Sequence, residues 1–229
     1  MVSVEERDGV TVVTADRPPV NAMNVELLEA VVGALDEVAA AAPAAVVLAG
    51  RPGAFSAGAD LKAIPGYGPE QQRAMVENIN RMALAAYSLP CPVVCAITGH
   101  AIAGGFVLAL TGDHRVASED GAYGLTEVKV GVPYPQAAIG VVREELGPSA
   151  ARLLALGNRL VSAEDCLRLG AFDEVVAPDA VVPRALEVAA ELGALPGEVY
   201  ARTKDGLRGE AIARLRAAAQ DDPLLAQWV

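Results

Sequence analysis

Two turns built from small residues have the composition to stabilise a developing negative charge. The stretch 98–108 follows the apolar run 92–97, which is typical of a buried strand, and leads into a short apolar helix over 106–110. Gly104 and Gly105 lack Cβ atoms, so the backbone there can come close to a ligand. The first N–H groups of a helix have no internal partner and suit an oxyanion. Tight packing of helix on strand would explain the two glycines equally well.

A second small-residue turn, 54–61, follows the apolar run 45–49. Two strand ends could each supply one N–H to a single carbonyl oxygen. In order and spacing, the two turns together resemble the crotonase (enoyl-CoA hydratase/isomerase) superfamily. The resemblance implies that the amides of Ala57 and Gly104 bind the substrate thioester, and that these two residues are both catalytic and substrate-binding.

Glu127 is the candidate base. It lies within 123–135, among Leu125, Val128 and Val130, and apolar surroundings raise the pKa of a carboxyl toward neutral pH. A surface glutamate at the end of a strand is the alternative on local sequence alone. The family resemblance implies that Glu127 is one of the catalytic carboxylates.

Val107 is the most informative departure from the family pattern. Hydratases of the family carry a glutamate three residues past the glycine amide, and here that position is valine. Valine can neither transfer a proton nor hold a water molecule. The family's Δ3,Δ2-enoyl-CoA isomerases also have an aliphatic residue there, and they share the S-A-G-x-D-L pattern of 56–61.

The sequence therefore predicts an acyl-CoA enzyme that moves a double bond from Δ3 to Δ2, with Glu127 carrying the proton. The alternatives are an enoyl-CoA hydratase, a decarboxylase or thioesterase of the same fold, and a non-catalytic acyl-CoA binder. Coenzyme A enters only as the carrier of the thioester, and an acyl-carrier protein could replace it. No other cofactor is expected.

Composition narrows the class further. The chain has 229 residues, 53% hydrophobic, and a net charge of −11. The acidic balance argues against nucleic-acid binding. We expect no metal site, because only two histidines exist and no His/Cys cluster has ligand spacing. Three cysteines without framework spacing, no signal-peptide pattern and no apolar run of membrane length favour a cytoplasmic protein.

Repeated strand–helix units predict an α/β fold with parallel pairing. Asp8-Gly9 favours a hairpin between 2–6 and 10–15, and Asn24 is a plausible N-cap. We expect further strands over 45–49, 92–97, 114–118 and 172–176, and helices over 70–89, 135–147, 148–157, 178–193 and 197–220.

By resemblance, the fold is a crotonase-like (ClpP/crotonase) spiral of ββα units with a helical C-terminal region. Residues 1–195 would form the core with the thioester site. Residues 196–229 would form a short helical region used in trimerisation, which implies a homotrimer or a hexamer built from two trimers. Lys204 lies in a segment whose lysine can approach CoA phosphates in the family, and a solvated basic face explains it about as well.

The remaining polar candidates favour structural roles. We expect His100 and His114 to be packed or at the surface. The family resemblance makes Asp113 and Arg115 structural, and leaves Tyr134 either lining the acyl pocket or purely structural. The stripe of Met75, Ile79, Met82 and Ala86 indicates core packing.

Overall fold

A computed structural model describes all residues from 1 to 229. Its strands are β1 Val2–Arg7, β2 Val10–Ala15, β3 Val46–Ala49, β4 Gly53–Ser56, β5 Val93–Ile97, β6 Gly99–Ile102, β7 His114–Ser118, β8 Tyr123–Gly124, β9 Leu160–Val161 and β10 Glu174–Val176. Its α-helices are α1 Val25–Ala41, α2 Pro69–Tyr87, α3 Gly104–Leu110, α4 Glu127–Val130, α5 Gln136–Glu145, α6 Pro148–Ala151, α7 Ala163–Arg168, α8 Val181–Gly193 and α9 Gly197–Gln220.

The larger sheet has six strands in the order β1-β2-β3-β5-β7-β10. The β1–β2 hairpin is antiparallel, as Asp8-Gly9 predicts, and every other pairing in this sheet is parallel. Its central strands are buried on both faces, so they are apolar without alternation. The predicted α/β class is confirmed.

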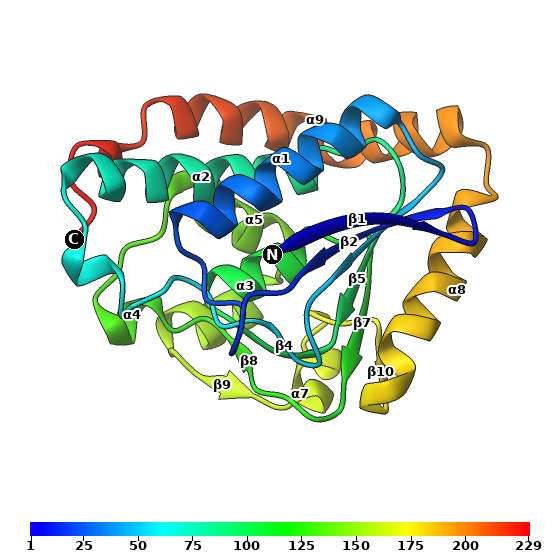
Figure 1. Ribbon diagram of the computed structural model, residues 1–229, viewed down its shortest axis with the longest axis horizontal. Coiled ribbons are helices and arrows are strands. Elements are labelled where there is room, and N and C mark those ends of the chain that lie inside the picture. The colour runs from blue at the N-terminus through cyan, green and yellow to red at the C-terminus, as the bar shows by residue number, and fades with distance from the viewer.

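Helices cover both faces of this sheet (Figure 1). Along β3, Val46 and Leu48 face the core beneath α1 and α2, whereas Val47 and Ala49 face α8. This alternation follows from the two-residue period of a strand. Met75, Met82 and Ala86 of α2 are fully buried in the same core as Val46 and Leu48, as their spacing predicts.

The smaller sheet positions the two glycine-bearing turns. It has the order β4-β6-β8-β9, with β4 and β6 parallel. Parallel neighbours end at the same edge of a sheet, so the turn after Ser56 and the turn after Ile102 are brought together. The turn after Ile102 opens α3, which begins two residues earlier than the predicted 106–110.

Most of the other predicted elements are confirmed within two or three residues. Asn24 caps α1 by accepting a hydrogen bond from the Leu27 N–H at 3.0 Å. The predicted helix 148–157 is α6 followed by one π-helical turn over Arg152–Leu156. Glu127 stands at the first residue of the short helix α4, not at the end of a strand.

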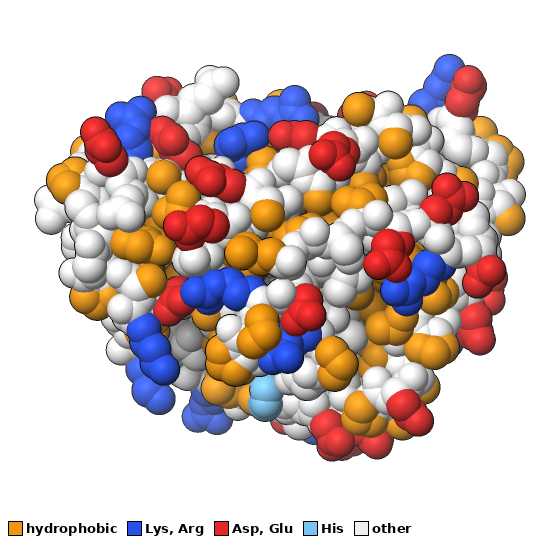
Figure 2. Space-filling model, in the orientation of Figure 1, with side chains coloured by type: hydrophobic (Ala, Val, Ile, Leu, Met, Phe, Trp, Pro, Cys, Tyr) orange, Lys and Arg blue, Asp and Glu red, His pale blue; other side chains and the backbone are white.

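Acidic and basic side chains are interspersed over the face of the molecule shown in Figure 2, without a broad field of one sign. None of the helices is long and apolar enough to cross a bilayer.

Candidate active site

A pocket lies where the two glycine-bearing turns meet α4 and the chain that follows it. Eleven of its sixteen lining residues are hydrophobic, which fits an aliphatic ligand better than a polar one. Ala57, Gly104 and Glu127 all line it. Three segments that are distant in sequence are therefore brought to one place, as the sequence predicts.

The backbone donors of the turn after Ser56 differ from the prediction. The Ala57 N–H donates to the Val20 carbonyl oxygen at 3.0 Å, so it is already paired. Met23 pairs with the residues on either side of Ala59. The Met23 N–H donates to the Gly58 carbonyl oxygen at 2.7 Å, and the Asp60 N–H donates to the Met23 carbonyl oxygen at 2.8 Å. In this parallel bridge the Ala59 N–H points away from Met23.

Ala59 lines the pocket and its N–H donates to no other group. The available amide of this turn is therefore that of Ala59, which corrects the assignment of Ala57. The Gly104 N–H opens α3 and has no partner inside the helix. The two turns thus bring the unpaired amides of Ala59 and Gly104 to one pocket.

Gly58 allows these two turns to touch. Its φ is +76°, and a Cβ placed on it would lie 2.7 Å from the Ala103 Cβ and 3.0 Å from the Gly104 nitrogen. Any side chain here would be strained by its backbone conformation and would push the turns apart. The close approach therefore depends on glycine.

Glu127 is the only acidic residue among those lining the pocket. Only 8% of its surface is exposed, and Oε2 has no hydrogen-bond partner. Burial raises the pKa of this carboxyl above its ordinary value of 4.5. The pKa of Glu127 is therefore closer to neutral pH, where a general base works best, than the pKa of a surface glutamate is.

Tyr134 also lines the pocket, which settles where this residue lies. Its hydroxyl faces the Glu127 carboxyl and lowers the pKa of Glu127, opposing the larger effect of burial. Neither the hydroxyl nor Glu127 Oε2 completes a hydrogen bond. Burial and the nearby Glu127 raise the pKa of Tyr134, so this side chain stays a neutral phenol.

Val107 is fully buried in the core, and it does not line the pocket. It can supply neither a proton nor a water site. The pocket therefore has one carboxyl, Glu127, and no second one from α3.

Lys204 does not line this pocket, and its surroundings contradict the interpretation of a solvated basic face. Its Nζ donates to the Cys91 carbonyl oxygen at 3.1 Å and pairs with Asp113 Oδ2 at 2.7 Å. The Val93 N–H donates to Asp113 Oδ2, and the Asp113 N–H donates to the Val93 carbonyl oxygen. The ion pair of Lys204 and Asp113 therefore lies at the start of β5, whereas the turn that carries Gly104 lies beyond the end of β5. Burial lowers the pKa of Lys204. Its ammonium is buried and paired, so it is not part of a solvated basic face.

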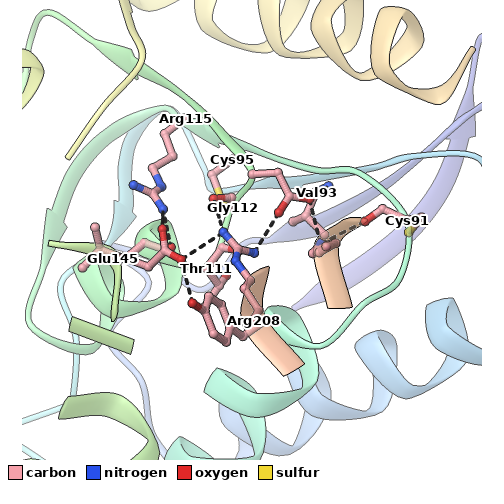
Figure 3. Close-up of polar contacts among 12 residues, drawn as sticks. Cys91, Val93, Cys95, Thr111, Gly112, Arg115, Glu145 and Arg208 are labelled. Carbon is pink, nitrogen blue, oxygen red and sulfur yellow. Dashed lines mark hydrogen bonds and ion pairs between the residues drawn. The ribbon is translucent and has the colours of Figure 1, made fainter. Parts of the chain in front are cut away.

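The same region contains a buried ion network that fixes α9 to the body of the protein (Figure 3). Arg208 pairs with Asp113 at 2.7 Å and with Glu145 at 3.0 Å, and its guanidinium stacks 4.3 Å from the centre of the Tyr87 ring. Arg115 also pairs with Glu145. Asp113 and Arg115 are structural, as predicted.

The histidines stand outside the pocket. His100 is exposed and accepts a hydrogen bond from Ala122 N through Nδ1 at 2.9 Å, while His114 pairs with Glu174 at 3.1 Å. No group of three or more His, Cys, Asp or Glu side chains could hold a metal ion.

Comparison with known proteins identifies the class of this fold and site. Residues 5–225 match the family model described as enoyl-CoA hydratase/isomerase. The sequence is 34% identical over 211 residues to a probable enoyl-CoA hydratase of Mycobacterium avium, covering 90% of this chain and 81% of the relative. The chain belongs to the enoyl-CoA hydratase/isomerase family, and the predicted membership of the crotonase superfamily is confirmed.

Solved structures give the same result for the fold. A probable enoyl-CoA hydratase from Mycobacterium tuberculosis superposes with a TM-score of 0.90 at 33% identity, covering 96% of this chain and 93% of that one. Human mitochondrial delta3-delta2-enoyl-CoA isomerase superposes with a TM-score of 0.89 at 31% identity, covering 96% and 88%. The crotonase-like fold is confirmed, and both reaction names occur among the relatives.

Sequence reasoning missed three features of the pocket. Ala59 lies two residues beyond the predicted donor, Ala57, but only the pairing of Met23 with Gly58 and Asp60 shows which amide is free. Met23 itself lines the pocket, and its sulfur lies 3.3 Å from where a Cβ on Gly104 would be. Trp228 also lines it, from near the end of the chain. Trp228 is the chain's single tryptophan and lies beyond the last predicted helix. Of the three missed features, it alone had a signal in the sequence.

Proposed function

We propose that this protein is an acyl-CoA enzyme that isomerises 3-enoyl-CoA thioesters to 2-enoyl-CoA thioesters, with Glu127 as the proton shuttle. One observation carries the proposal: Glu127 is the single carboxyl in an otherwise largely apolar pocket, and α3 carries the buried Val107 where a second carboxyl would stand. One carboxyl is enough to move a proton along a chain. Adding water across a double bond uses two such groups in the hydratases.

The thioester oxygen would accept hydrogen bonds from the Ala59 and Gly104 amides. Ionised Glu127 takes a proton from C2, and the electron pair of that C–H bond passes into a dienolate whose charge rests on the thioester oxygen. Glu127, now protonated, returns the proton to C4. The double bond moves from C3–C4 to C2–C3, and no atom is gained or lost. One positioned oxyanion donor contributes about 10²–10³ in rate.

The surroundings of Glu127 suit both halves of this transfer. Burial raises the pKa of the carboxyl, so the ionised form is a stronger base and the protonated form persists long enough to return its proton. Apolar lining keeps bulk water away from the dienolate, which suppresses competing hydration and proton exchange.

Hydration is the second candidate, because Tyr134 gives the pocket another protic group. Its hydroxyl faces Glu127 and is buried without a partner. In a hydratase, that hydroxyl would have to hold or protonate one of the reacting groups in place of the missing glutamate. The relatives named hydratases support this alternative.

Other expectations for the protein remain proposals. We propose coenzyme A as the thioester carrier, with no metal or other cofactor, and a cytoplasmic homotrimer or dimer of trimers. Two exposed lysines, Lys62 and Lys129, are adjacent in sequence to the pocket residues Leu61 and Val130. They are better placed than Lys204 to meet the phosphates of coenzyme A.

A paired assay tests the isomerase proposal. Purified protein is supplied with trans-3-hexenoyl-CoA and, separately, with crotonyl-CoA, and Glu127→Gln serves as the control for both. The proposal expects 2-hexenoyl-CoA from the first substrate, loss of that activity in Glu127→Gln, and little hydration of the second. Hydration of crotonyl-CoA at a comparable rate would favour the hydratase. Failure on both substrates would count against either reaction.

A further inference from the structure

The last eight residues of the chain fold back over the pocket of their own subunit. After α9 ends at Gln220, the chain turns and runs down beside the start of α2 (Figure 1, red). Near its end, Trp228 is only 4% exposed and lines the pocket with Ile79 and Val132. A tail with no structural task would leave a tryptophan in contact with solvent or loosely ordered.

Asp222 anchors the start of this tail. It is 3% exposed, and its Oδ2 accepts hydrogen bonds from Asn80 Nδ2 at 2.9 Å and from the Gln136 N–H at 2.7 Å. Asn80 in turn accepts from the Ala137 N–H at 2.8 Å. The residue preceding α5 is Pro135, which has no side-chain cap to offer. Asp222 and Asn80 therefore supply the capping of α5 from elsewhere in the chain.

Trp228 is held at the other end of the tail. Its Nε1 donates to the Pro133 carbonyl oxygen at 3.0 Å, on the segment that also contributes Tyr134 and Pro135 to the pocket. The hydrogen bond satisfies the one polar atom of the indole, so the rest of the ring can present an apolar surface to the pocket. With Asp222 fixed on α5, the indole has little freedom to move aside.

We propose that Trp228 is the floor of the acyl pocket and limits the length of the acyl chain that this protein accepts. This inference rests on the proposed action on acyl-CoA thioesters, and it narrows their class to short and medium chains. Chains that end before the indole gain apolar contact with each added methylene. Chains that would extend past it must displace a tail fixed by buried hydrogen bonds.

The single tryptophan allows a direct test without mutation. Saturated acetyl-, hexanoyl- and decanoyl-CoA are titrated into the wild-type protein while indole emission is followed, with free coenzyme A as the control. Saturated thioesters cannot isomerise or be hydrated, so the result does not depend on which reaction the protein catalyses. We expect no change in emission with coenzyme A or acetyl-CoA, and a clear change once the chain reaches the indole. Equal responses to every ligand, or no response to any bound ligand, would overturn the proposal.

Variants test the length limit itself. Trp228→Ala should bind decanoyl-CoA more tightly than wild type by about fourfold for each methylene newly buried, while its affinity for acetyl-CoA stays within about twofold. Trp228→Phe, which keeps a ring, should retain most of the limit. Calorimetric binding gives the affinities, and thermal unfolding shows whether each variant is folded.

If Trp228→Ala fails to fold, the intermediate-sized Trp228→Leu replaces it in the same series. A folded variant with an unchanged length profile would overturn the proposal, even if the protein proves to be an isomerase. A shifted profile in a protein that does not isomerise would refute only the proposed reaction.

Discussion

The Tyr134 hydroxyl faces the Glu127 carboxyl in the pocket, and both Tyr134 Oη and Glu127 Oε2 are buried without a completed hydrogen bond. Unpaired polar atoms in an apolar pocket are costly unless a ligand uses them. Burial raises the pKa of Glu127, and the neighbouring hydroxyl limits that rise. The pair therefore sets the pH at which the proposed base becomes active.

Tyr134→Phe should move the acidic limb of the pH–activity profile to higher pH. Removing the hydroxyl takes away a group that lowers the pKa of Glu127, so a higher pH is needed to ionise the base. The measurement is kcat/KM for trans-3-hexenoyl-CoA against pH. Tyr200→Phe, a matched change beside Asp113 and away from the pocket, should leave the limb in place. An unmoved limb in Tyr134→Phe would show that Tyr134 does not act on Glu127.

Glu127→Gln should stabilise the protein while it abolishes activity. The folded-state pKa of Glu127 is raised above its ordinary value of 4.5. Above pH 4.5 the unfolded chain loses this proton before the folded protein does, so wild-type stability falls as pH rises through the folded pKa. Glutamine has no charge to desolvate. The advantage of Glu127→Gln should therefore grow with pH across that window and vanish below it.

Urea unfolding at several pH values measures this effect. Glu29→Gln, on the exposed side of α1 and in no ion pair, is the control for a surface carboxyl. A destabilised Glu127→Gln protein at neutral pH would mean that the carboxylate makes a favourable contact in the folded state.

Gly58→Ala should lower activity by about 10² or more, because an added Cβ would force apart the turns that carry Ala59 and Gly104. Some loss of stability should accompany it, since φ is +76° at this position. Gly66→Ala is the matched control nearby, where a Cβ would meet nothing within 4 Å. The comparison uses kcat and the urea midpoint of both variants. Wild-type kcat in folded Gly58→Ala would argue against the two-amide site.

Substitutions in the buried ion network beneath α9 should lower the stability of the protein by unequal amounts. It contains three cations, Lys204, Arg208 and Arg115, and two carboxylates, Asp113 and Glu145. Asp113→Asn leaves three cations against one carboxylate and should destabilise by about 3–5 kcal/mol. Lys204→Met leaves two of each sign and should cost much less.

Neither change in this network should raise the KM for a CoA thioester, because both residues lie at the opposite end of β5 from the pocket. Lys62→Ala provides the contrast if Lys62 meets the coenzyme A phosphates, since its KM should rise while its stability is unchanged. A large KM increase in Lys204→Met with normal stability would restore Lys204 as a phosphate ligand.

Local sequence signals predicted the elements of this fold well. Asn24 caps α1 as predicted, because capping depends on residues three positions apart. The predicted helix 197–220 coincides with α9. The two turns and Glu127 also meet as expected, although the short helix that begins at Glu127 was not predicted.

Features that depend on long-range pairing could not be predicted in the same way. The Ala57 N–H is occupied because it donates to the Val20 carbonyl oxygen. The Ala59 N–H is free because Met23 pairs with Gly58 and Asp60 instead. Lys204 looked like a surface cation because its partner, Asp113, is 91 residues away. The position of Trp228 depends on Asp222 reaching the start of α5, which no local pattern records.

The proton transfer itself is the central claim, and isotope tracing tests it most directly. A single turnover of 3-hexenoyl-CoA carrying two deuterium atoms at C2 is run in ordinary water, and the product is analysed for deuterium at C4. A proton shuttle through Glu127 in a pocket shielded from water predicts that a measurable fraction of the deuterium appears at C4, and that Glu127→Gln forms no product. Product with only protium at C4, or product formation by Glu127→Gln, would contradict the account.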